Sequence, residues 1–180
     1  MSDRTAPHEP IDQGHASSSR AGHLDVPVPM RWSDIDGYGH VNNATMLRLL
    51  EEARIRAFWR PSDEQVELGA PVSPTALPAF APGSGVHTIV ASNRVEYLRE
   101  LGLRQDGVIV RLGISRIGGA SMTLDYQVLT RDDPAGENPY AIARTVLVMV
   151  SAQTRRPVRL DDDVRAALAP YTMSPLAFRD

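Results

Sequence analysis

The stretch NNATMLRLLEEARIRAFWR, residues 42–60, contains neither Gly nor Pro. Its apolar positions recur every three or four residues, at Leu47, Leu50, Ala53 and Ala57. This spacing places them on one face of a helix, and Glu52 stands four residues before Arg56, the favourable order for a helical ion pair. Asn42 or Asn43 can cap the start, because an Asn side-chain oxygen accepts an amide hydrogen bond from the first turn. The stretch therefore predicts one long helix over 42–60.

Runs on both sides of this helix are typical of strands. Apolar residues occupy every second position of residues 24–33, which places on one face of a strand Leu24, Val26, Val28, Met30 and Trp32. Pro27 and Pro29 restrict the start of this strand to an edge or a bulge. Four further strand-like runs follow the helix, over residues 86–98, 108–117, 122–130 and 142–151. Turn residues separate them, so an antiparallel sheet is predicted. Residues 161–168 predict a short terminal helix with acidic residues in its first turn.

The order of these elements predicts an α+β fold. A sheet of about five strands must bury one face, and the helix over 42–60 is the only predicted element long enough to cover it. We therefore expect a curved antiparallel sheet wrapped around one long central helix. The length of 180 residues fits one domain, which we place at 23–180. Residues 1–22 contain one large aliphatic residue, Ile11, and predict a disordered tail. The proline-rich connection 61–85 has no predicted conformation.

The composition excludes several classes of chemistry. A formal charge of -3 argues against a nucleic-acid partner. All 19 basic residues are Arg and there is no Cys, which excludes Schiff-base lysines, thiolate nucleophiles and Cys-ligated zinc. The histidines near the N-terminus, His8, His15 and His23, are widely spaced, and we expect no metal and no cofactor. No apolar run approaches the roughly 18 to 20 residues of a membrane span. We expect a cytoplasmic protein with no membrane partner.

The densest set of functional side chains precedes the predicted helix. It comprises Asp34, Asp36, Tyr38, His40, Asn42 and Asn43. Taken singly, these residues favour a structural interpretation in which the aspartates form turns and the asparagines cap the helix. Taken together, they place a carboxylate and an imidazole four residues apart beside the amides of a helix N-terminus, which can bind developing negative charge. That combination suits acyl transfer.

The stretch R31-W-S-D-I-D-G-Y-G-H-V-N-N-A-T-M-L-R-L-L-E-E-A-R54 closely resembles the opening of hotdog-fold thioesterases. The similarity is to the 4-hydroxybenzoyl-CoA thioesterase class and to plant acyl-ACP thioesterases. Three later segments resemble that family's landmarks in the same order: V95-E-Y-L-R, R116-I-G-G-A-S121 and R156-P-V-R-L160. The resemblance spans roughly residues 26–168. It implies a hotdog fold, which agrees with the architecture derived above from periodicity.

The resemblance also implies roles for single residues. Asp36 aligns with the carboxylate that acts as nucleophile or general base, and His40 with a histidine that assists water activation or orients the thioester. Tyr38 stands where the acyl-ACP branch carries Asn, so that branch's full Asp, Asn and His set is not present. Asn42 and Asn43 are expected to support the site, one as the helix cap and one by holding the loop. A tight glycine turn is expected to lie near CoA, at Gly118, Gly119, Ala120 and Ser121.

The expected activity is hydrolysis of an acyl thioester, acyl-CoA or acyl-ACP, to a free acid and a thiol. A non-catalytic acyl-CoA-binding or sensing protein is the alternative. An open curved sheet leaves edges that proteins usually pair or cover. We therefore expect a homodimer or homotetramer, and the resembled family shares its active sites between subunits. The sequence leaves open the acyl type, the carrier and the exact role of Asp36.

Overall fold

The computed structural model describes residues 18–20, 22–70, 72–73, 75–81 and 83–179. Most of the tail predicted over 1–22 lies outside the described residues. At Ser18–Arg20 the structure departs from that prediction, because these residues form strand β1 and pair antiparallel with the next strand. The division into a tail and a domain at 23–180 stays a prediction.

A single antiparallel sheet forms the body of the molecule. Its longer strands are β2 (His23–Val28), β3 (Val86–Tyr97), β4 (Val108–Ile117), β5 (Ser121–Leu129) and β6 (Ala141–Ser151). With β1 added, the strand order is β1-β2-β4-β5-β6-β3. The strands β4, β5 and β6 form a meander at the centre, and β3 lies at one end, paired only with β6 within the described chain.

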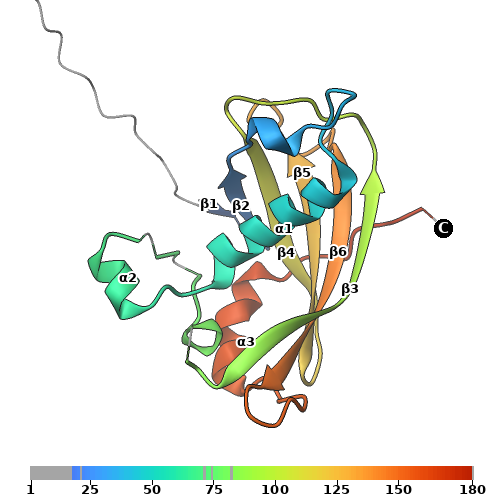
Figure 1. Ribbon diagram of the computed structural model, residues 1–180. Coiled ribbons are helices and arrows are strands. Elements are labelled where there is room, and N and C mark those ends of the chain that lie inside the picture. The colour runs from blue at the N-terminus through green and yellow to red at the C-terminus, as the bar shows by residue number, and fades with distance from the viewer. Residues whose placement is uncertain (1–17, 21, 71, 74, 82, 180) are drawn as a thin grey trace, which may run out of the picture.

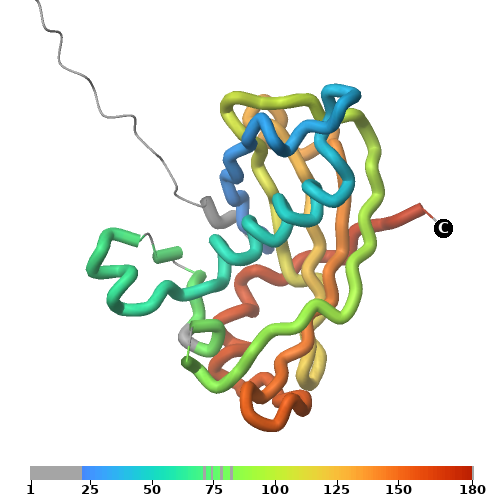
Figure 2. The backbone as a smooth tube through the Cα atoms, in the orientation of Figure 1, coloured from blue at the N-terminus to red at the C-terminus, as the bar shows by residue number. Residues whose placement is uncertain are grey.

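The central helix α1 (Asn43–Phe58) crosses one face of this sheet, as Figures 1 and 2 show. The ion pair predicted along it forms, with Arg56 Nε 2.7 Å from Glu52 Oε1. The curved sheet and its enclosed helix confirm the predicted hotdog fold. Among the described residues no helix is long and apolar enough to span a bilayer.

One of the four core positions predicted for α1 is wrong, and further residues of the helix are buried. Leu50, Ala53 and Ala57 are buried as expected, whereas Leu47 is 39% exposed. Leu49 is buried in its place, because the buried face of a helix that lies in a curved sheet is wider than a single row. The helix core packs against alternate residues of the strands.

The first predicted strand is too long. Leu24, Val26 and Val28 are buried on one face as predicted, but β2 ends at Val28 and Trp32 is 81% exposed. The reason is local: Pro29 follows the strand directly, and a 3₁₀ turn, Trp32–Asp34, starts three residues later. Alternation alone does not detect that change of backbone conformation.

The remaining elements flank the lower half of α1. The stretch that had no predicted conformation contains a short helix, α2 (Asp63–Glu67), and a 3₁₀ turn over residues 78–80. The terminal helix α3 (Asp162–Leu168) begins after its cap Asp161 and ends where predicted. Figure 1 shows α2 projecting away from the sheet and α3 packed near its lower end.

The C-terminal segment is fastened to the face of the sheet opposite α1. Asp125 is fully buried there and makes a two-pronged contact with Arg144, at 2.6 Å for both nitrogens. The main-chain N–H of Leu176 donates to the same carboxylate at 2.7 Å. The ring of Phe178 then lies between the guanidinium groups of Arg94 and Arg144, at 4.8 and 4.7 Å from its centroid.

Candidate functional site

The loop between β2 and α1 is held in shape by its own main chain. The Asp36 N–H donates to the His40 carbonyl at 2.9 Å, and the Gly39 N–H donates to the Asp36 carbonyl at 3.1 Å. Gly39 has a φ of 85°, which a residue with a Cβ rarely adopts. Asp34 closes the preceding turn, because its carboxylate accepts the Arg31 N–H at 2.6 Å. These bonds fix the position of the Asp36 side chain relative to the start of α1.

The Asp36 carboxylate is half-buried and oriented by main-chain donors. Its Oδ1 accepts the N–H of Tyr38 at 2.8 Å and the N–H of His40 at 3.3 Å. Within the described residues both bonds fall on Oδ1, so Oδ2 is left for a water molecule or a substrate. A carboxylate held in this way keeps one direction without being shielded from a ligand.

A cleft of about 360 Å³ opens beside this carboxylate. Its walls are Asp36, His40, Val41, Asn43, Met46 and residues 97–101. His40 Nε2 lies 3.3 Å from Glu100 Oε2. The far wall is tied to the helix by the Tyr97 hydroxyl, which donates to the Asn43 carbonyl at 3.2 Å, and burial raises the pKa of Tyr97.

The supporting residues divide into two groups. Asn42 caps α1, because its Oδ1 accepts the Ala44 N–H at 2.9 Å. Asn43 is the first residue of the helix and lines the cleft. Tyr38 is 88% exposed and does not line the cleft, although its N–H holds Asp36. Glu100 was not singled out by the sequence. It directly follows the quoted V95-E-Y-L-R landmark, which was the available signal.

The glycine turn lies at the other end of the sheet. Gly118 donates its N–H to the Ser121 carbonyl at 2.7 Å, which makes the tight turn that the sequence predicted between β4 and β5. Arg165 donates to the Gly118 carbonyl at 2.6 Å from α3. The ten residues of β4 separate this turn from the Asp36 loop, about 30 Å at the rise of a strand. Figures 1 and 2 show the two loops at opposite ends, so one chain alone does not bring them together.

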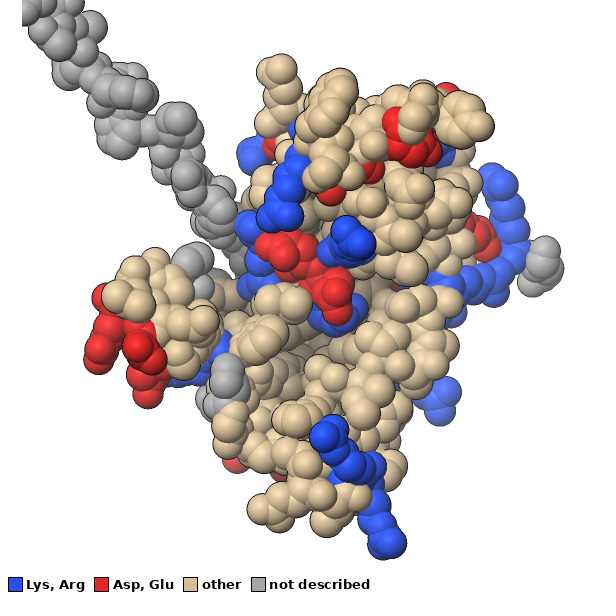
Figure 3. All heavy atoms as spheres, viewed as in Figure 1, with Lys and Arg blue, Asp and Glu red and all other residues tan. Residues whose placement is uncertain are grey.

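A second cavity lies along the C-terminal half of α1. It has a volume of about 400 Å³ between α1 and the first half of β3, with Arg54 and Trp59 on its helix side. Figure 3 shows acidic and basic side chains mixed over α1 and a largely uncharged surface below it, toward β3. The sequence predicts no function for Arg54, because periodicity alone does not distinguish a charged residue at a cavity from one at the surface.

Comparison with known proteins now decides the family. The family model described as the thioesterase-like superfamily matches residues 30–168. The chain belongs to this superfamily. It is 27% identical over 145 residues to the uncharacterized protein YsmA of Bacillus subtilis (strain 168), covering 78% of this chain and 82% of that protein.

Solved structures of thioesterase-like proteins share the fold. One, described as a predicted thioesterase from Bacillus stearothermophilus, is 25% identical, with a TM-score of 0.62 over 85% of this chain and 98% of that chain. Another is a thioesterase from Thermus thermophilus complexed with coenzyme A and Zn, 30% identical, with a TM-score of 0.58 over 84% and 96%. A DHNA-CoA thioesterase from Staphylococcus aureus, 17% identical with a TM-score of 0.61 over 81% and 87%, shares the fold.

These comparisons reach the superfamily and support thioester hydrolysis in general. They do not reach the 4-hydroxybenzoyl-CoA class within it, which stays a prediction, as do the roles of Asp36 and His40. Among the described residues, no three His, Asp or Glu side chains gather as a candidate metal site.

Proposed function

We propose that this thioesterase-like protein hydrolyses acyl-CoA thioesters, with Asp36 as the general base or the nucleophile. One observation carries the proposal: a carboxylate held by two main-chain N–H groups borders an open cleft at the N-terminus of the central helix. That arrangement supplies a base with a fixed direction and, nearby, amide dipoles that favour negative charge. Acyl-ACP is the alternative carrier.

The chemistry at this site has two possible forms that end in the same products. As a base, Asp36 takes a proton from water while the water oxygen bonds to the thioester carbon; the C–S bond then breaks, and the proton held by Asp36 passes to the leaving thiolate. As a nucleophile, Asp36 bonds to that carbon itself, the C–S bond breaks, and water then cleaves the resulting anhydride. In both forms the carbonyl oxygen carries negative charge, which amides at the start of α1 stabilise. The leaving thiolate takes up one proton, and a free acid and CoA thiol remain. His40 lies beside Asp36 to orient the thioester.

A second copy of the chain completes this site in our proposal. The outer edge of β3 is unpaired within the described residues, and exposed apolar side chains flank it, including Ile89, Tyr97 and, directly after α1, Trp59. Edge strands are usually paired or covered. Antiparallel pairing of two β3 strands places opposite ends of the two copies together, so the Gly118–Ser121 turn of one copy approaches the Asp36 cleft of the other. There the turn's main chain is available for the CoA phosphates.

A panel of acyl-CoAs with detection of free thiol tests the activity. We expect turnover by the wild type and a loss of about 10²- to 10⁴-fold in Asp36→Asn, the effect of removing a positioned base. Asp34→Asn is the matched control, because an Asn at that position still accepts the Arg31 N–H, and it is expected to stay within a few-fold of wild type. Tight binding of acyl-CoA with no thiol release identifies a sensing protein and rejects the proposal. If the protein hydrolyses acyl-ACP but no acyl-CoA, the carrier in the proposal is ACP and not CoA.

A further inference from the structure

Arg54 places a cation in the buried row of the central helix. Leu50 stands four residues before it and Phe58 four residues after it, and both are buried. The Arg54 side chain is only 14% exposed. A charged group taken out of water is unfavourable unless it meets acceptors or a ligand supplies them. The partners of Arg54 therefore decide what its guanidinium is for.

Those partners leave the guanidinium with spare donors. Arg54 Nη2 donates to Glu51 Oε1 at 3.2 Å, but the Glu51 side chain is 57% exposed and faces solvent. On its inner side Arg54 lies beside the buried hydroxyl of Tyr126. Beyond Tyr126, the Thr145 hydroxyl donates to Asn93 Oδ1 at 2.7 Å. A guanidinium carries five N–H groups, and within the described residues the Glu51 carboxylate is its one anionic acceptor.

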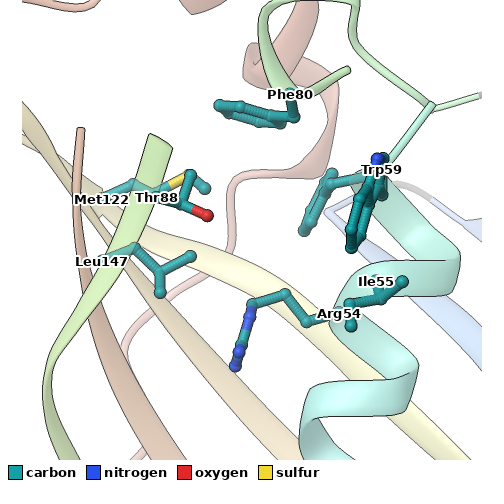
Figure 4. A pocket seen from close by; sticks show the side chains of 8 residues that line it. Arg54, Ile55, Trp59, Phe80, Thr88, Met122 and Leu147 are labelled. Atoms are coloured by element: carbon teal, nitrogen blue, oxygen red, sulfur yellow. The ribbon is translucent and has the colours of Figure 1, made fainter. Parts of the chain in front are cut away.

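Apolar side chains form much of the cavity around Arg54, and Glu51, His87 and Thr88 also line it. Its walls include Ile55, Trp59, Phe80 and Leu147, and a narrow recess of about 60 Å³ continues inward to Met122. Figure 4 shows Arg54 reaching from α1 toward the strands, with Trp59 at the end of that helix and Phe80 on a separate segment facing the same cavity. Largely apolar walls with a few fixed polar groups are typical of a pocket that orients a small ligand.

We propose that this cavity receives the acyl part of the substrate and that Arg54 binds a carboxylate at the far end of that acyl group. This inference rests on the proposed function and names its substrate class: acyl-CoAs with an apolar acyl body and a terminal carboxylate. The planar fork of Arg matches a carboxylate with two parallel hydrogen bonds. An acyl group that ends in a methyl group fills the same space but displaces water from the Arg54 guanidinium and offers no hydrogen-bond acceptor in return. Its binding is therefore disfavoured.

The cavity and the catalytic cleft lie on the same side of the molecule. Both are bordered by α1 and β3: the cleft by Met46 and Tyr97, the cavity by Ile55 and Thr88. Met46 and Arg54 are eight positions apart on α1, about 12 Å along the helix axis. An elongated acyl group can therefore extend from a thioester beside Asp36 toward Arg54.

Matched pairs of substrates test this inference. We would measure kcat/KM for straight-chain acyl-CoAs and for the ω-carboxyacyl-CoAs of equal chain length, across a series of lengths. For at least one length we expect the wild type to favour the carboxylated member by roughly tenfold or more, the effect of a charged hydrogen-bonded pair. In Arg54→Met the ratio is expected to fall to about one. Arg48→Met, on the exposed side of the same helix, is the control and should keep the wild-type ratio.

The outcomes separate this inference from the proposed function. Thiol release with equal kcat/KM for both members of every pair overturns the Arg54 assignment and leaves the activity intact. A wild-type preference that persists in Arg54→Met overturns it as well. If Arg54→Met does not fold, Arg54→Gln provides the same comparison, because it keeps hydrogen-bond donors and loses the charge. No thiol release from any thioester rejects the proposed function itself.

Discussion

The imidazole of His40 lies 3.3 Å from the carboxylate of Glu100, across the cleft that Asp36 borders. The two residues come from different loops, one before α1 and one after β3. Main-chain contacts hold these loops together, because Val41 donates its N–H to the Leu101 carbonyl at 2.8 Å. We therefore propose Glu100 as a positioning residue for His40, since the pair links the two walls of the cleft.

Loss of this pair should act through His40 alone. We expect His40→Gln to lower kcat/KM by roughly 10²-fold and Glu100→Gln to lower it less. The double variant should be no worse than His40→Gln, because Glu100 then has no imidazole to orient. The kcat/KM values of the wild type, the two single variants and the double variant form a double-mutant cycle. Additive losses would show that Glu100 has a separate role, and Glu96→Gln serves as a control outside the cleft.

If two copies pair through β3, a charged substitution on that edge strand should lower the mass of the assembly in solution. Ile89→Lys places a cation on the exposed edge strand, a feature that blocks strand pairing in natural sheets. We expect sedimentation to show a dimer or larger assembly for the wild type and a monomer for this variant, with thioesterase activity lost together with assembly. Leu68→Lys, on an exposed site far from that edge, should change neither. A wild type that stays monomeric at micromolar concentration contradicts the pairing.

The cap of α1 has a measurable effect on stability. Asn42→Ala removes the side-chain acceptor of the Ala44 N–H, and we expect the free energy of unfolding to fall by about 1 kcal/mol. Denaturant titration at constant m-value is the measurement. Asn43→Ala, one position later and without a capping bond from its side chain, should change stability by less than about 0.5 kcal/mol. Equal losses in both variants would argue against the capping role.

Arg144 should contribute more to stability than an arginine with exposed partners, because it neutralises the buried carboxylate of Asp125. Arg144→Met leaves Asp125 inside the protein without its cation, and we expect a loss of about 3 kcal/mol in unfolding free energy. Arg104→Met removes two exposed contacts, to Asp106 and Asp132, and is expected to lose less than about 1 kcal/mol. If Asp125→Asn combined with Arg144→Met is no more stable than Arg144→Met alone, the uncompensated charge is not the cause.

Alkaline pH should destabilise the protein through Tyr126. Burial raises the pKa of Tyr126, and the neighbouring Arg54 cation offsets part of that rise. In the unfolded chain the phenol ionises near pH 10, so its contribution to stability is complete below that pH and is lost as the pH rises toward the native pKa. Tyr126→Phe should flatten the fall of unfolding free energy above pH 10, whereas exposed Tyr38→Phe should not. Parallel curves for wild type and Tyr126→Phe would contradict this.

The local sequence pattern was sufficient to predict the helices and strands, but not which of their residues are in contact. The strand β4 has the predicted bounds, and α1 begins and ends within two residues of the prediction, because Gly, Pro and Asn mark those boundaries in the sequence. The exposed Leu47 could not be predicted, since the buried face of α1 depends on how the sheet curves around it. The end of β2 depends on a 3₁₀ turn that alternation does not reveal.

The candidate site shows the same limit. Asp36, His40 and the cap Asn42 were predicted from a motif of neighbouring residues, and the structure places them together. Glu100 and Arg54 reach their positions by tertiary packing, across loops and between helix and sheet, so no spacing in the sequence connects them with Asp36. A glycine turn was expected near the same ligand, yet it lies at the opposite end of the chain's sheet.

The strand order has a consequence for synthesis on the ribosome. The strand β2 pairs with β4, and β3 pairs with β6, so both wait for partners that are translated much later. Apart from the short hairpin β1-β2, the described sheet closes locally through the meander β4-β5-β6, and such local contacts form fastest. During translation α1 and β3 therefore expose apolar surface until residue 151 has emerged. Nascent chains stalled before that point should require chaperones, and released full-length chains should not.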